Sequence, residues 1–298
     1  MIDILALIPA ILRISTPLIL AGLGVHISSK AGVLNIGIEG MMLAGALAGV
    51  VVSALTQSAW LGFGAALLTG ALLAGLLSVV IHLLRADLVL SGIALNMAAI
   101  AGTTLALFAL TGDKGISGSL PSLVLPSLTI PVLHDVPVLG PILSGHHVLT
   151  YLGLLAVPLV GLLVTRTPFG LAMQAVGENR EAAAATGIPV LRVQVSALLI
   201  SGLFAGAAGA FLSMGYVSWF SQNMTAGRGF IALAADVMGF GYAWGTMAAA
   251  LLLGATEATT LSLQGVGVPS ELLQAIPYLV PVLAMVIHAR HNRLHKDH

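Results

Sequence analysis

The stretch "AWLGFGAALLTGALLAGLLSVVIHLL", residues 59–84, runs for 26 residues without an Asp, Glu, Lys or Arg. About 20 consecutive apolar residues are enough for a helix to cross the hydrocarbon core of a bilayer. The whole chain has the same character, with 58% hydrophobic and 7% charged residues, which is more apolar than a soluble domain of this size. We therefore predict an all-α, polytopic transmembrane helical bundle, with residues 1–298 forming one domain.

Eight further windows carry few charges and extend the same prediction along the chain. They are residues 14–29, 36–55, 88–110, 148–164, 193–216, 229–240, 244–263 and 272–288. Together with the first stretch they predict about nine crossings, within a range of 8–10. Arg13 separates the first window from an apolar leader that is expected along the membrane surface. The window 229–240 is short, which indicates a broken or re-entrant element.

Basic residues set the expected orientation, because Lys and Arg concentrate in short cytoplasmic loops. One alternation places Lys30, Arg85, the segment 166–192 and the tail 289–298 inside, and leaves Lys114 outside. The segment 110–147 is then an external loop. It contains five prolines, so a continuous membrane helix is not expected there. The loop is either a stiff connector between two halves or a docking surface for an external partner.

Composition narrows the function classes. The formal net charge is zero, so it supplies no argument for a nucleic-acid partner. Cysteine is absent, which removes thiolate metal sites and cysteine nucleophiles. A membrane enzyme is disfavoured because no nucleophile–base or metal-ligand spacing stands out. No metal or cofactor is expected.

The polar stretch "GENREAAAATGIPVLR", residues 177–192, stands out in this apolar chain. Five of the 27 residues 166–192 are charged. Asn179 is a typical N-cap before a run of helix formers, and Gly187 and Pro189 are stop signals. A helix of about seven residues is marginal alone in water. The segment is therefore expected either to dock on another protein or to rest on the lipid head groups as a connector.

Four charged residues fall within the apolar windows or at their edges: Glu39, Arg228, Asp236 and Glu257. Because a charge inside a bilayer is costly, such residues mark a site or an ion pair. Glu39 has a second interpretation, as a first-turn acid stabilised by a helix N-terminus near the cytoplasmic surface. The pattern Asn35-x3-Glu39-Gly40 also has a partial echo in Asn223-x4-Arg228-Gly229.

If the two patterns are inverted repeats, each opens a discontinuous helix whose free amide end faces a polar cavity. Such a cavity suits a neutral, hydroxylated solute. The candidate substrate-binding residues are Asn35, Glu39, Asn96, Asn223 and Arg228, with Gln222 and Thr225 as further hydrogen-bonding groups. Trp219 or Phe220 could stack on a ring, although an interfacial aromatic belt explains them as well. Asn96 could instead make only an interhelical hydrogen bond.

Three separated motifs resemble one known family. They are "TPLILAGLGVHISSKAGVLNIGIEGMMLAGA" (16–46), "GENREAAAATGI" (177–188) and "NMTAGRGFIALAADVMG" (223–239). They resemble permease subunits of ATP-binding-cassette importers for ribose, nucleosides and branched-chain amino acids, particularly the nucleoside and simple-sugar branch. The resemblance implies a multi-pass protein of the bacterial plasma (inner) membrane. It also implies a second permease chain, identical or different, and an external or periplasmic substrate-binding protein.

The resemblance further implies that a separate cytoplasmic ATPase subunit uses the ATP. This chain contains no G-x-x-x-x-G-K-[ST] phosphate loop. The residues implied to couple to the ATPase are Gly177, Glu178, Asn179, Arg180, Glu181, Ala182, Ala183 and Gly187. The alternative function is an ion-coupled secondary transporter of small polar solutes, which would use Glu39 or Asp236 as its proton or sodium site.

Overall fold

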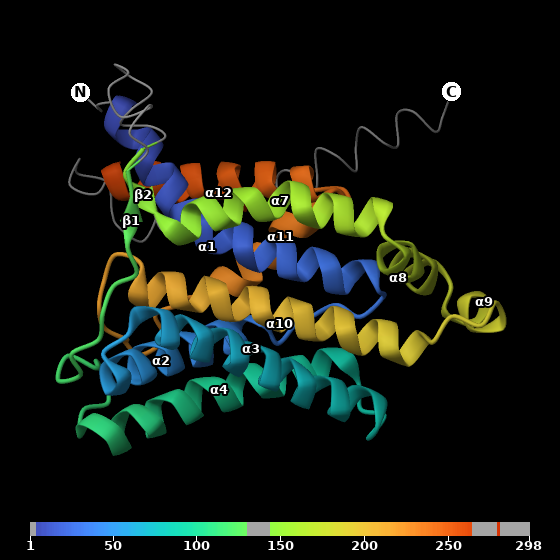
Figure 1. Ribbon diagram of the computed structural model, residues 1–298, viewed down its shortest axis with the longest axis horizontal. Coiled ribbons are helices and arrows are strands. Elements are labelled where there is room, and N and C mark those ends of the chain that lie inside the picture. The colour runs from blue at the N-terminus through green and yellow to red at the C-terminus, as the bar shows by residue number, and fades with distance from the viewer. Residues whose placement is uncertain (1–3, 130–143, 264–278, 281–298) are drawn as a thin grey trace.

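The computed structural model describes residues 4–129, 144–263 and 279–280. Its long helices run roughly along one axis (Figure 1). The elements are α1 (Ile4–Lys30), α2 (Ile38–Thr56), α3 (Ala59–His82), α4 (Leu88–Thr111), β1 (Ser127–Leu128), β2 (His146–His147), α7 (Val148–Arg166), α8 (Pro168–Glu178), α9 (Arg180–Ala185), α10 (Val190–Met214), α11 (Arg228–Met238) and α12 (Ala243–Leu263).

Seven of the described helices are long and apolar enough to cross a membrane: α1, α2, α3, α4, α7, α10 and α12. They confirm the polytopic helical bundle, and each corresponds to one apolar window. The window 229–240 forms α11, whose 11 residues span only about 16 Å, so it does not cross. The window 272–288 lies outside the described residues except for 279–280, which are helical.

The separate leader expected before Arg13 is wrong. Helix α1 continues without a break from Ile4 to Lys30 and passes through Arg13, Pro9 and Pro17. Arg13 lies with its guanidinium 5.2 Å from the ring centroid of Tyr216. This cation–π contact gives the charge a partner within the protein, so the helix has no need to end there.

Helix α10 lies at the centre of the bundle and packs against α1, α2 and α3 (Figure 1). Small residues allow the helix backbones to approach closely. A Cβ added to Gly70 of α3 would lie 2.1 Å from the carbonyl oxygen of Gly202 in α10. Close approach of this kind supplies the van der Waals contact that holds membrane helices together where lipid offers no hydrophobic driving force.

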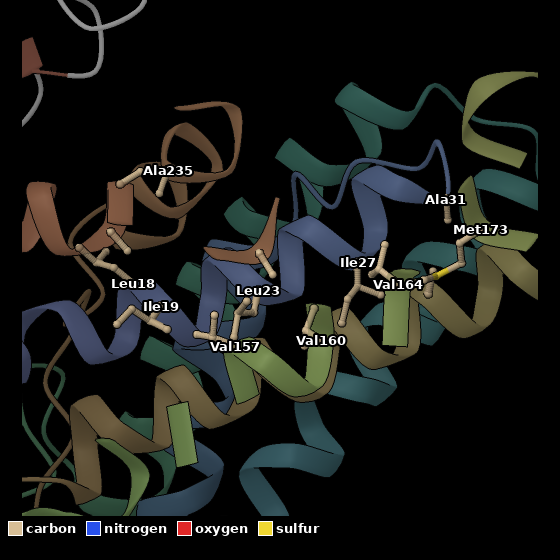
Figure 2. Close-up of a cluster of buried hydrophobic side chains, with 14 of the residues drawn as sticks. Leu18, Ile19, Leu23, Ile27, Ala31, Val157, Val160, Val164, Met173 and Ala235 are labelled. Atoms are coloured by element: carbon tan, nitrogen blue, oxygen red, sulfur yellow. The ribbon is translucent and has the colours of Figure 1, made fainter. Parts of the chain in front are cut away.

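An apolar cluster surrounds α1. Its members Leu18, Leu23 and Ile27 of α1 pack with Val157 and Val160 of α7, as Figure 2 shows. The cluster continues to Ala31, just after α1, and Met173 of α8 (Figure 2). The short polar segment α8–α9 is therefore attached to the same core as the membrane helices.

The two ends of the bundle differ. Helices α1 and α7 end, and α10 begins, at the end that carries α8 and α9, while β1 and β2 lie at the opposite end (Figure 1). Lys30 and Arg166 occupy the last turns of α1 and α7. These two basic residues, both predicted to lie inside, thus share one end, whereas the tail 289–298 lies outside the described residues. That this end is the cytoplasmic one remains a prediction from the charge pattern.

The described parts of the segment 110–147 are consistent with its prolines. Beyond the end of α4, residues 112–129 contain no helix. Strands β1 and β2 pair antiparallel, with Ser127 opposite His147. An isolated bridge between Ile116 and Ser221 ties this segment to the chain that leads from α10 to α11.

Candidate transport site and coupling surface

Helix α2 begins inside the bundle, where side chains of other helices hold its start. After Lys30 the chain turns, and Nδ2 of Asn35 donates to Oγ of Ser201 in α10 at 2.9 Å. Oδ1 of Asn96 in α4 accepts from the amide of Gly40 at 2.8 Å, and its Nδ2 donates to the carbonyl of Ile36 at 2.9 Å. Asn96 therefore caps a helix other than its own. Both asparagine side chains are buried.

Glu39 joins the start of α2 to the start of α11. Its Oε1 accepts from the amide of Gly227 at 2.8 Å and its Oε2 accepts from the amide of Gly229 at 2.6 Å. The expectation of free amide ends facing a cavity is wrong for these groups, because the carboxylate occupies them. The first-turn interpretation is only partly right, since Glu39 lies in the first turn of α2 but caps α11.

Gly229 is required for this approach. A Cβ at that position would lie 2.7 Å from both Cα and Oε2 of Glu39. The preceding Gly227 has a φ of +81°, which favours glycine. The two glycines of the second motif thus serve the contact between the two helix starts.

Arg228 and Glu257 form an ion pair with each other, which is one of the two roles that the sequence predicted for charges in the apolar windows. Nη2 of Arg228 lies 2.6 Å from Oε1 of Glu257 in α12, and Nη1 donates to the carbonyl of Met224 at 3.2 Å. The two side chains keep 24% and 19% of their surface exposed. The two charges therefore compensate each other, but both side chains remain partly accessible from the surface of the protein.

Asp236, the fourth charged residue, is buried where α1, α11 and α12 meet. Its Oδ1 lies 2.9 Å from Nδ1 of His26 and accepts from Oγ1 of Thr246 at 3.1 Å. Its Oδ2 accepts from Oγ of Ser29 at 2.8 Å. Sequence reasoning missed His26, because nothing in the spacing connects a residue of α1 with one 210 positions later.

A hollow of about 650 Å³ opens between α4 and the segment before α11. It is lined by Met97, Ile100, Ala101, Thr104, Leu105, Phe108, Lys114 and Gln222. The amide of Gln222 donates to the carbonyl of Gly115 at 2.8 Å, which fixes this wall. Its neighbour Asn223 is exposed and has a φ of +54°. The volume is in the range of small-molecule sites.

The aromatic residues and Thr225 divide between core and surface. Phe220 is fully buried in the cluster between α2 and α10, so it does not meet a solute in this conformation. Thr225 is fully buried as well. Trp219 keeps 45% of its surface exposed, and Tyr216 a similar fraction. Neither interpretation of Phe220, as a residue that stacks on a ring or as part of an interfacial belt, fits this position, because its ring completes the apolar core.

The polar loop forms the predicted short helix. Oδ1 of Asn179 accepts from the amides of Glu181 (3.1 Å) and Ala182 (2.9 Å), which confirms the N-cap. Helix α9 has six residues, and Gly187 follows with a φ of +85°, which confirms the stop. The charged side chains of Glu178, Arg180 and Glu181 are exposed, whereas Ala183 is buried. The loop presents its charges outward while one alanine anchors it.

Gly177, at the end of α8, touches the turn that follows α1. A Cβ at Gly177 would lie 2.3 Å from the carbonyl oxygen of Lys30 and 3.2 Å from the amide nitrogen of Gly32. The same turn leads directly to Asn35 and Glu39. The end of α8 and the turn after α1 are far apart in the sequence, and no charge or motif predicted that they would be in contact.

The opposite end of the bundle contains a buried histidine. His147 caps α7, since its Nδ1 accepts from the amide of Leu149 at 3.2 Å. Its ring packs against Phe211 and Tyr216, and burial lowers the pKa of His147 to about 4. Burial also raises the pKa of Tyr216 above its ordinary value. A neutral imidazole is therefore part of the packing at this end.

Comparison with known proteins gives this arrangement a family. The chain is 35% identical over 294 residues to the guanosine ABC transporter permease protein NupQ of Bacillus subtilis, covering 94% of this chain and 90% of the relative. It is 32% identical over 286 residues to the nucleoside ABC transporter permease protein NupC of Lactococcus lactis, covering 92% and 89%. A putative glucose ABC transporter permease protein, TsgC13 of Haloferax volcanii, is 41% identical over 234 residues, covering 76% and 68%.

No solved structure matches the chain. The family described as "Branched-chain amino acid transport system / permease component" matches residues 7–287, which is nearly the whole sequence. Membership of an ABC permease family implies an ATPase and a substrate-binding protein as partners, and with seven helices able to cross a membrane it indicates a multi-pass inner-membrane protein. The chain thus belongs to the permease subunits of ATP-binding-cassette importers.

Proposed function

We propose that this permease carries a nucleoside or a simple sugar into the cell, driven by a separate ATPase. The observation that carries the substrate class is the naming of two relatives, for guanosine and for nucleosides, that align with 94% and 92% of the chain. A relative named for glucose keeps simple sugars in the proposal. Both classes are neutral, hydroxyl-rich molecules.

The candidate substrate-binding residues fall into two groups by exposure. Asn35, Glu39 and Asn96 are buried and hydrogen-bonded, so their proposed role is to hold the starts of α2 and α11 in place. Asn223 is exposed and Arg228 partly so, which leaves them available to a solute. The hollow beside Gln222 and Phe108 adds an amide for hydroxyl groups and an aromatic ring for a sugar or base face.

The partly exposed Arg228–Glu257 pair supports a second permease chain. A charge facing hydrocarbon at the bilayer centre costs about 2.5–3.5 kcal/mol even on the lenient insertion scale. Exposed fractions of 24% and 19% therefore favour a surface that adjoins water or protein. A pathway between two permease chains would provide both. The second chain is a copy of this one or a homologue.

The proposed docking surface for the ATPase consists of residues 177–187, with α9 at its tip. Its exposed charges offer contacts to a soluble protein, and Ala183 anchors it to the core. Movement of this loop would reach the turn at Lys30 through Gly177, and that turn continues into the segment containing Asn35 and Glu39. Nucleotide-driven closure of the ATPase would in this way shift the paired helix starts.

The ion-coupled alternative loses its support. The family is one of ATP-driven importers. Glu39 is occupied by two backbone amides, and Asp236 by three side chains. Both carboxylates therefore have structural partners that account for their burial.

The first experiment is a pull-down of the solubilised permease with its candidate ATPase. The wild type is compared with a variant in which residues 177–187 are replaced by a Gly/Ser linker. We expect the ATPase to bind the wild type and to be lost from the variant. Retention by both would reject this docking surface, and binding to neither would reject the ATPase as partner.

The second experiment measures uptake into proteoliposomes that contain the permease, the ATPase and the external binding protein. Radiolabelled guanosine is competed with nucleosides and with hexoses. ATP-dependent uptake that nucleosides or hexoses displace supports the proposal. Uptake that proceeds equally without ATP would overturn it.

A further inference from the structure

We propose that His26 and Asp236 are positioning residues that attach the C-terminal end of α11 to α1. Helix α11 then moves as one rigid unit with the turn between α1 and α2. This inference rests on the proposed function, because it names the element that the ATPase moves. Glu39 binds the N-terminal end of α11, and the cluster of His26, Ser29 and Thr246 around Asp236 binds its C-terminal end.

The cluster at Asp236 is fully engaged. Both carboxylate oxygens have partners: His26 and Thr246 on Oδ1, and Ser29 on Oδ2. His26 is 1% exposed and Asp236 is 6% exposed. A carboxylate accepts, so Nδ1 of His26 donates. Two of the three donors belong to the last turns of α1, so the cluster attaches α11 mainly to that helix.

The two attachments of α11 lie on either side of the turn at Lys30 in the chain. Ser29 immediately precedes Lys30, and Glu39 follows it by nine positions. The turn itself contacts Gly177 of α8. A displacement of α8 therefore reaches the two ends of α11 through one short piece of chain.

The opposite face of α11 is open. Phe230 and Val237 are 47% and 56% exposed, whereas Gly229, Ala232 and Ala235 are buried against the bundle. Figure 1 shows α11 behind α1, and it packs on α1, α12 and α2. Helix α11 can therefore shift with its anchors without displacing a described neighbour on its exposed side.

Matched variants separate this role from general loosening of the fold. His26→Leu removes the donor to Asp236, whereas His26→Asn keeps an amide nitrogen near the position of Nδ1. Thr246→Val removes a second donor, and Thr246→Ser keeps it. Thr16→Val is the control, because Thr16 also lies in α1 and its hydroxyl bonds Thr150 of α7 at 3.1 Å without touching α11.

The main measurement is the amount of solute carried per ATP hydrolysed, with the solute KM, in proteoliposomes that contain the full importer. We expect His26→Leu and Thr246→Val to lower this ratio at least tenfold while the ATPase still binds. His26→Asn and Thr246→Ser should stay within about threefold of wild type. The control Thr16→Val should keep the wild-type ratio even where it lowers stability.

A second readout follows α11 directly. The chain has no cysteine, so Val237→Cys introduces a single reactive thiol on the exposed face. Its labelling rate by a membrane-impermeant maleimide should change on ATP binding, and this change should be lost when His26→Leu is added. If His26→Leu does not fold, the Thr246→Val and Thr246→Ser pair carries the same comparison.

Two outcomes would overturn the inference. One is an unchanged ratio in folded His26→Leu or Thr246→Val, and the other is an ATP-dependent labelling change that persists in them. In both cases wild-type uptake remains ATP-dependent, so the proposed function stands. A wild type that shows no ATP-dependent uptake would instead reject the proposed function, and this inference with it.

Discussion

Oε2 of Glu39 lies 2.6 Å from the backbone nitrogen of Gly229, a residue 190 positions later in the chain. The carboxylate thereby supplies the negative charge that a helix N-terminus favours, but to a helix other than its own. The start of α11 depends on α2 through this contact. Any change at Glu39 is consequently a change at two helices.

Replacement of Glu39 by Ala should leave two amides of α11 without an acceptor. An unsatisfied buried donor costs about 1–3 kcal/mol, so we expect a loss of about 3 kcal/mol of stability and of most transport. Glu39→Gln keeps one acceptor oxygen and should lose less stability, about 1 kcal/mol. Denaturation in detergent and ATP-driven uptake test this order. Equal stability of the two variants would contradict it.

The Arg228–Glu257 pair should show coupling in a double-mutant cycle. Removing one partner leaves a partly buried charge uncompensated, so Arg228→Gln or Glu257→Gln alone should be worse than both together. Since the pair is partly exposed, we expect a coupling energy of about 2 kcal/mol. Thermal unfolding of the four proteins provides the cycle, and additive effects would show that the pair contributes little.

Gly177→Ala should disturb the contact between α8 and the turn at Lys30. The new Cβ would lie 2.3 Å from the carbonyl oxygen of Lys30, so backbone must shift. Overpacking of this kind costs about 1–3 kcal/mol. We expect the ATPase to bind while solute uptake per ATP falls. Gly64→Ala in α3 is the control, because no atom lies within 4 Å of its added Cβ.

The double substitution Glu178→Arg and Glu181→Arg should preserve the fold, because both side chains are exposed. It reverses the charge of the proposed docking surface and should therefore uncouple ATP hydrolysis from transport. ATPase stimulation by solute and its binding protein measures the effect. Unchanged coupling in the double variant would favour a connector that rests on lipid.

Stability should fall as the pH is lowered through the range set by His147. Its pKa is about 4 in the folded protein and near 6.5 when unfolded, so between these values the unfolded state binds more protons. Stability therefore rises with pH there, and about 2 kcal/mol should be lost between pH 7.5 and pH 5. His147→Asn keeps a capping acceptor but does not titrate. Melting curves of both proteins should diverge on acidification, and parallel curves would exclude His147 as the cause.

Much of the fold was predictable because long apolar runs have few alternatives in a bilayer. Helix α3 begins at the first residue of its window, and α9 begins after Asn179 and is followed by Gly187, as their signals predicted. These features depend on local composition and on hydrogen bonds within a few residues. The resemblance carried by three motifs also led to the right family.

The site was less predictable because its contacts join distant parts of the chain. The motifs around Asn35 and Asn223 were recognised, but their amides were expected to be free and are instead occupied by Glu39 and Asn96. Phe220 was expected as a possible ring contact and is a core residue. The type of a residue does not show which distant residue it will hydrogen-bond to or pack against.

The sequence by itself determined that this is a multi-helix membrane protein with a polar loop at residues 177–192, because the cost of burying charge and backbone in lipid depends mainly on local composition. Tertiary structure decided that Glu39 caps α11, that His26 meets Asp236, and that Gly177 touches the turn after Lys30. Each of these contacts exists only when packing brings together residues that are far apart in the chain. Their free energy comes from groups that are solvated separately until the bundle excludes water from them.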